Sequence, residues 1–216
     1  MSDFLDAVKG GDASAVRAFL DRDGSLAGQG ENGVSPVMLA LYHGRRDIAR
    51  LLIERGAALS FHDACAAGEN DRARAMLRED PSLLDRRAPD GYPPLGLAIF
   101  FGNRELATLL IAEGADVNAA ADNPQRVAPV HAAAAVRDHE ILRLLLDRGA
   151  DPDARQQMDY TPLHTAASRG DREMAELLLA RGADRGAIGS DGMTVAGLAA
   201  KYGQHEFAQW WDTVNG

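Results

Sequence analysis

The 216-residue sequence contains a single cysteine, Cys65, so no disulfide bond can form within the chain. This usage is typical of a reducing compartment. No segment approaches the roughly 18 consecutive apolar residues that a membrane-spanning helix needs, and the first residues show no basic-then-apolar leader. We therefore expect a soluble, cytoplasmic protein that does not insert into a membrane.

The chain is also short of positive charge. It has 23 basic residues against 32 acidic ones, which gives a net charge of −9. The long-range field of such a chain repels phosphate backbones and anionic lipid surfaces, so we expect neither a nucleic-acid nor a membrane partner. The hydrophobic content of 46% is ordinary for a globular protein, and the length is sufficient for a sizeable core.

Familiar catalytic signatures are absent from the sequence. There is no GxSxG, P-loop, GxGxxG or paired-cysteine motif, and His139-Glu140 does not continue as HExxH. Gly28, Gly30 and Gly33 lie in a loop that follows no predicted strand and precedes no phosphate-binding helix. We expect a protein that is not an enzyme and that needs no cofactor or metal.

What the sequence does contain is a repeated pattern. TPLHTAASRG, from Thr161 to Gly170, places a proline and a glycine eight residues apart, and related stretches begin at Pro36, Pro94, Pro129 and Val195. A second apolar stretch follows each one, with apolar residues three and four apart, as in a helix with one buried face, and glycine follows most of these stretches. With two less obvious units, the pattern predicts seven helix pairs that begin near residues 2, 35, 59, 93, 128, 161 and 194.

The repeat is uneven at two places. Only 24 residues separate the second and third units, so a connecting hairpin there must be missing or shortened, and the third unit ends in Asp80-Pro81 instead of Gly-Ala. In the fifth unit Arg137 replaces the glycine between the two helices. We expect local irregularity at these positions. The first and third units match at an offset of 57 residues, which indicates a tandem duplication of a two-repeat block.

These residues and their period resemble the ankyrin repeat family, whose 33-residue period and T-P-L-H-x-A signature match Thr161–Ala166. The endings GADVN at Gly114–Asn118 and GADPDA at Gly149–Ala154 fit as well. The resemblance implies an all-α, ankyrin-like solenoid of about seven helix-turn-helix repeats with short β-hairpin loops. It predicts a single domain over residues 1–216, with an N-terminal cap at about 1–28 and a C-terminal cap at about 190–216.

The resemblance also assigns roles to individual residues. His131 and His164 are expected to hydrogen-bond local backbone and steady the hairpins, and Thr161 is placed to cap a helix. Cys65 stands where other repeats carry alanine, so we expect a small buried side chain. At the C-terminus, Trp210 and Trp211 occupy the places of core leucines, and at least one of them should cover the last core layer.

A binding surface follows from the same resemblance. In the family, the two residues before the inter-helix glycine face the concave side, and the residue two before the proline lies on the hairpin. The candidate partner-binding residues at such positions are Tyr42, His43, Tyr92, Phe100, Phe101, Val136, Tyr160, Arg169 and Tyr202. A solvated surface would be mostly polar there, so this apolar and aromatic set indicates a contact site. The alternative is that Phe100 or Phe101 packs into the stack and fills space left by the shortened hairpin.

We therefore expect a non-catalytic interaction module, monomeric, that binds an unidentified partner protein through its concave face and hairpin tips. The acidic balance favours a partner with some basic surface. Two alternatives remain. One is a regulatory or inhibitory subunit of a larger complex. The other is a small-molecule-binding or metal-binding protein, or an enzyme, that uses His62 and Cys65, with His43, near the junction of the second and third units.

Overall fold

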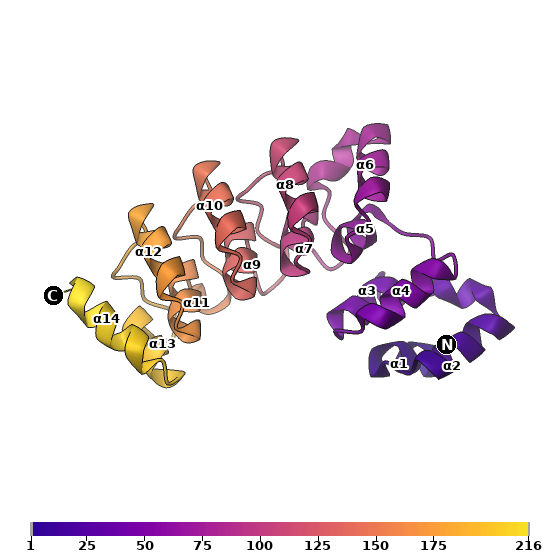
Figure 1. Ribbon diagram of the computed structural model, residues 1–216, viewed down its shortest axis with the longest axis horizontal. Helices are drawn as coiled ribbons and strands as arrows, with labels where there is room; N and C mark the ends of the chain where they lie inside the picture. The colour runs from indigo at the N-terminus through magenta and orange to yellow at the C-terminus, as the bar shows by residue number, and fades with distance from the viewer. Residues whose placement is uncertain (1, 216) are drawn as a thin grey trace. The chain divides into compact units, whose positions relative to one another are not determined.

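The computed structural model describes residues 2–215, which form fourteen α-helices paired as seven successive repeats (Figure 1). The helices are α1 (Ser2–Gly10), α2 (Ala13–Arg22), α3 (Pro36–Tyr42), α4 (Arg46–Glu54), α5 (Phe61–Ala67), α6 (Asn70–Glu79), α7 (Pro94–Phe100), α8 (Arg104–Ala112), α9 (Pro129–Val136), α10 (His139–Asp147), α11 (Pro162–Arg169), α12 (Arg172–Ala180), α13 (Val195–Lys201) and α14 (His205–Asn215). Short 3₁₀ helices occur at Gly24–Gly28, Pro81–Asp85 and Gln157–Asp159. The predicted all-α repeat fold and the seven starting positions are confirmed.

The loops between repeats are closed by hydrogen bonds and not by β-strands. Over residues 2–215 the structure has only isolated bridges, Glu31 with Val34 and Ile188 with Thr194. The backbone N–H of Gln156 donates to the carbonyl of Tyr160 at 3.1 Å, and other loops close in the same way. The expected hairpins are therefore present as tight turns, each too short to form a ladder.

Local sequence explains where the helices begin. Pro36 occupies the first turn of α3, where a missing N–H leaves no bond unmade, and the Ser35 side chain accepts from the Met38 N–H at 3.0 Å. Thr161 is the N-cap residue of α11, as expected, and its backbone N–H donates to Nδ1 of His164 at 3.1 Å. The Thr161 hydroxyl lies 3.0 Å from the same nitrogen.

The turn between the helices of a repeat needs a left-handed residue. Gly170 adopts φ +64° there, a conformation that costs glycine nothing. Arg137 adopts φ +58° at the equivalent place, so the turn keeps its form although the glycine is replaced. Its guanidinium Nε lies 3.0 Å from the buried carboxylate of Asp171, in the next repeat. The backbone irregularity that was expected at Arg137 is therefore absent, and only the residue type differs from the other repeats.

The chain divides into two compact units, Met1–Leu109 and Leu110–Gly216, with the boundary inside α8. In the second unit successive repeats pack in order, α9 on α11 and α11 on α13, and neighbouring loops pair through the Ser190 N–H and the Met158 carbonyl at 2.9 Å. Trp211 of α14 is buried and stacks on Phe207, as expected for a residue that covers the last layer. The prediction of one domain over 1–216 stays a prediction.

The first unit contains the main departure from a regular array. Only six residues, Arg55 to Ser60, connect α4 to α5, so the third repeat (α5 and α6) has no hairpin. The second and fourth repeats consequently touch each other across it. The rings of Tyr42 and Phe101 lie 5.7 Å apart, and the Arg46 guanidinium donates to the Phe101 carbonyl. The predicted loss of the hairpin is confirmed.

Candidate functional site

The two family-signature histidines are structural. Nδ1 of His131 accepts from the Ala128 N–H at 3.2 Å, and its Nε2 lies 3.3 Å from the carbonyl of Tyr160 in the next loop. His164 makes the same pair of contacts, with Nε2 3.2 Å from the Met193 carbonyl. Burial lowers the pKa of His131 to about 4, and burial also lowers the pKa of His164. Each ring is therefore a neutral brace between successive loops, as predicted.

An aromatic cluster of Tyr42, Phe100 and Phe101 lies at the ends of α3 and α7 in the first unit. Phe101 is 6% exposed and packs edge-on against Phe100, with ring centroids 5.2 Å apart. Phe100 is 50% exposed and Tyr42 38% exposed. The expectation that Phe101 contributes exposed surface is wrong, and the alternative that one of the two phenylalanines packs into the stack is confirmed. The buried ring of Phe101 packs against the ring of Phe100 and so holds Phe100 in its exposed position.

Hydrogen bonding fixes Tyr42 in this cluster. Its hydroxyl donates to the Asp90 carboxylate at 2.5 Å. Burial, followed by this bond to the carboxylate, raises the pKa of Tyr42 far above its usual range. Tyr92 is half-buried against the core of the unit, whereas His43, at the end of α3, is exposed. The sequence-predicted residues of this unit thus comprise two exposed aromatic rings, one exposed histidine and two residues that are largely packed.

The predicted residues of the second unit show a similar mixture. Val136 and Tyr202 are 37% and 59% exposed, and Arg169 is also exposed. Tyr160 is half-buried, because its ring stacks on His164 at 5.0 Å and its hydroxyl donates to Asp191 at 2.8 Å. Burial and the bond to Asp191 raise the pKa of Tyr160 to about 12. Tyr160 therefore braces a loop more than it offers free surface.

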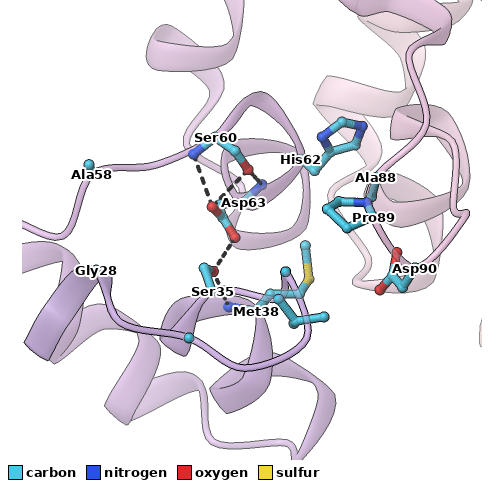
Figure 2. Close-up of a pocket in the computed structure, with 13 residues that line it drawn as sticks. Gly28, Ser35, Met38, Ala58, Ser60, His62, Asp63, Ala88, Pro89 and Asp90 are labelled. Carbon is cyan, nitrogen blue, oxygen red and sulfur yellow. Dashed lines mark hydrogen bonds between the residues drawn. The ribbon is translucent and has the colours of Figure 1, made fainter.

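A cleft of about 370 Å³ opens where the third repeat lacks its hairpin (Figure 2). The loop before α3 forms one wall, the loop before α7 forms the other, and the first turn of α5 lies between them. Gly33 and Pro89 meet where the two loops approach, since a Cβ on Gly33 would lie 3.0 Å from the Pro89 Cβ. The thirteen lining residues are Gly28, Gly30, Gly33, Val34, Ser35, Met38, Ala58, Ser60, His62, Asp63, Ala88, Pro89 and Asp90.

Asp63 is the most constrained polar group in this cleft. It occupies the place that His164 has in the sixth repeat, and it accepts from the Ser60 N–H at 2.9 Å and the Ser60 hydroxyl at 2.7 Å. The Ser35 hydroxyl donates to its other oxygen at 2.5 Å. Figure 2 shows these bonds converging on one carboxylate, which is only 3% exposed. Asp63 thus performs with hydroxyl partners the bracing that histidine performs in later repeats.

The structure does not assemble the histidine and cysteine residues of the alternative site. His62 lines the cleft, but Cys65 is completely buried in α5 and His43 lies outside the lining. Burial raises the pKa of the Cys65 thiol well above its usual range, which removes the thiolate that a nucleophile or metal ligand requires. Burial also lowers the pKa of His62. Among residues 2–215 no group of three or more His, Cys, Asp or Glu side chains is placed to hold a metal ion.

Sequence reasoning missed two features of these surfaces. The structural role of Asp63 and the place of Asp90 in the cleft were not predicted, although the 24-residue spacing indicated a missing or shortened hairpin at this junction. Met158 and Ile188 are exposed apolar residues in the loops of the second unit, 44% and 51% exposed. The sequence signal that could have identified Met158 and Ile188 is the presence of a large apolar residue in a loop that is otherwise expected to be polar.

Comparison with known proteins agrees with the structure. The family description for ankyrin repeats in three copies matches residues 61–156 and 130–210, and the single ankyrin repeat matches residues 32–64. The chain belongs to the ankyrin repeat family. Ankyrin repeats are generally protein–protein interaction modules, and the family is generally non-enzymatic. No helix within residues 2–215 is long and apolar enough to cross a membrane.

Similar proteins come from distant organisms. The chain is 32% identical over 149 residues to an ankyrin repeat-containing protein of Treponema pallidum, a match that covers 69% of this chain and 41% of that protein. It is 31% identical over 155 residues to human neurogenic locus notch homolog protein 2, covering 68% of this chain and 6% of that protein. Human ankyrin repeat and SOCS box protein 16 is 34% identical over 109 residues, or 47% of this chain and 24% of that protein. The chain therefore spans less than half of each of these relatives.

Proposed function

We propose that this chain is a non-catalytic module that binds a partner protein. The contact surface is formed by exposed residues at the C-terminal ends of the first helix in several repeats. In the first unit the contact residues are Phe100, Tyr42 and His43, together with the half-buried Tyr92. In the second unit they are Val136, Arg169 and Tyr202, together with the half-buried Tyr160. Membership of a family of interaction modules supports the general role.

The observation that carries the proposal is the pairing of Phe100 with Phe101. A half-exposed phenylalanine leaves apolar surface in water, and this one cannot fold away because the space beneath it is filled by Phe101. Aromatic side chains on a rigid support lose little conformational entropy when they bind, and such residues dominate the energetics of protein interfaces. A partner that buries Phe100 therefore gains free energy without rearranging the repeat.

Affinity capture from the source cells tests this function. Immobilised wild-type protein should retain a partner that Phe100→Ala retains at a level at least about tenfold lower, the loss expected when a central aromatic contact is truncated. Arg50→Ala provides the matched control, because Arg50 is an exposed residue of α4. Equal recovery on all three proteins, each with unchanged helical content, would remove Phe100 from the binding surface.

A further inference from the structure

One row of exposed residues crosses three successive repeats of the second unit. Val136, Arg169 and Tyr202 are 33 positions apart in sequence (169 minus 136 and 202 minus 169), and each directly precedes the left-handed residue between the two helices of its repeat. They lie at the C-terminal ends of α9, α11 and α13, which Figure 1 shows side by side, and α11 packs against both of its neighbours. All three side chains are exposed, so this Val-Arg-Tyr row is open to a partner.

Arg169, at the centre of the row, has no counterion within the chain. Over the part of the chain that the structure describes, its guanidinium forms no ion pair and no hydrogen bond. The carboxylates that follow it in sequence are engaged by the preceding repeat. Asp171 lies 3.0 Å from Nε of Arg137, and Glu173 lies 3.4 Å from Nδ1 of His139. A chain with a net charge of −9 thus leaves an exposed arginine unpaired.

Lys201, which precedes Tyr202 in sequence, adds a second positive charge to the row. Among the described residues it forms no ion pair, and its long-range attraction is to Asp191, a carboxylate that already accepts from the Tyr160 hydroxyl at 2.8 Å. Basic residues in the last turn of a helix complement the helix dipole, as Arg169 and Lys201 both do. That effect acts through charge alone and leaves the hydrogen-bond donors of both side chains free to bind a carboxylate.

The spacing of the row sets the form of its ligand. Packed helices lie about 8–10 Å apart and an extended chain advances about 3.3 Å per residue, so a segment crosses from one repeat to the next in about three residues. We propose that the row binds an extended, acidic segment of the partner protein. A glutamate or aspartate of the segment pairs with Arg169, and apolar residues about three positions to either side pack on Val136 and Tyr202. The inference rests on the proposed function and adds the partner's sequence pattern; the row is a local exception to the acidic charge of the chain.

Substitutions at exposed positions test the row without disturbing the core. Arg169→Glu reverses the central charge, and Tyr202→Ala removes the aromatic end of the row. Arg143→Glu, at an exposed position of α10, is the matched control for the charge reversal. Short random peptides displayed on phage are selected on the wild-type protein. Each selected peptide is then titrated against these three variants and Phe100→Ala, after circular dichroism has shown that each variant keeps its helical content.

The expected result is a set of peptides that share an acidic residue with an apolar residue about three positions to either side. Arg169→Glu should weaken their binding about tenfold, because repulsion replaces attraction, and Tyr202→Ala about fivefold, whereas Arg143→Glu should have no effect. Replacing the acidic residue of the peptide by lysine should restore binding to Arg169→Glu.

Three results would overturn this assignment: selected peptides without a shared acidic residue, equal affinity of the peptides for Arg169→Glu and Arg143→Glu, or failure to select any peptide. Peptides weakened by Phe100→Ala alone would also overturn it while leaving the proposed function intact. Failure of the proposed function itself would appear separately, as equal recovery of partner in the affinity capture.

Discussion

The Ser35 hydroxyl donates to the Asp63 carboxylate at 2.5 Å, so the residue that caps α3 is tied directly to the first turn of α5. Asp63 also completes a capping box with Ser60. This arrangement joins the second and third repeats at the point where no hairpin connects them. Hydrogen bonds replace the loop contacts that later repeats use.

Asp63→Ala should therefore be destabilising. It removes the capping partner of Ser60 and leaves the Ser35 hydroxyl without its acceptor, and together these losses should lower the free energy of unfolding by about 2–3 kcal/mol. Urea denaturation followed by circular dichroism measures the change. Glu54→Ala, at an exposed position near the end of α4, should shift the free energy by less than about 0.5 kcal/mol. A comparable effect of both substitutions would contradict this role of Asp63.

Adjacent phenylalanines should behave in opposite ways. Phe101 is 6% exposed, and Phe101→Ala should cost about 3–5 kcal/mol of stability through the cavity that it leaves. Phe100→Ala should cost about 1 kcal/mol or less, mostly from the lost edge-to-face contact. Thermal unfolding of the two variants side by side gives the comparison. Equal losses would show that Phe100 is a core residue and would weaken its assignment to binding.

Acid should destabilise the protein between pH 6.5 and 4. Burial lowers the pKa of His131 to about 4, so as the pH falls from the ordinary histidine value of 6.5 the unfolded chain takes up a proton before the folded chain does. Stability is complete above this window and falls through it, by an amount on the order of 3 kcal/mol from His131 alone. His62 and His164, whose pKa values are also lowered by burial, act in the same direction.

Urea titrations at several pH values measure this slope. His131→Gln should lower stability at pH 7.5 and flatten the slope between pH 6.5 and 4. His205→Gln, at an exposed position in α14, should leave the slope unchanged. A slope in the wild-type protein that His131→Gln does not reduce would contradict the assignment of His131 as a neutral brace.

The Cys65 thiol should be inert in the folded protein. It is completely buried, and burial raises its pKa, so neither access nor ionisation favours reaction. A disulfide reagent at pH 8 should label it only in urea, at the rate of unfolding. Rapid labelling of native protein would revive a nucleophilic role for this residue.

The repeat architecture could be predicted from the sequence, because each helix pair repeats both its turn residues and its apolar spacing. Pro162, Gly170 and their counterparts define the period, and the seven starts follow from it. The absence of a hairpin at the second-to-third junction was also predictable, since six residues cannot both leave α4 and form a loop.

The roles of individual side chains could not be predicted as well. Phe100 and Phe101 both occupy positions that the repeat pattern assigns to the concave face, but only Phe101 is buried. Phe101 contacts the ring of Tyr42 across the third repeat, and the two residues are 59 positions apart in sequence (101 minus 42). Thr161 caps α11 as expected, but the contact of its hydroxyl with Nδ1 of His164 could not be predicted from the sequence. The bracing role of Asp63 could not be predicted, because the third repeat lacks the signature that would mark it as the counterpart of His164.

Site-specific photo-crosslinking tests the central claim most directly. A photoreactive phenylalanine analogue, p-benzoylphenylalanine, is placed at position 100 in one variant and at position 50, on α4, in another, and both are irradiated in the source cells. We expect a crosslinked partner protein from position 100 and none from position 50. Crosslinking from position 50 alone, or an absence of any adduct at position 100, would contradict recognition through the exposed aromatic cluster.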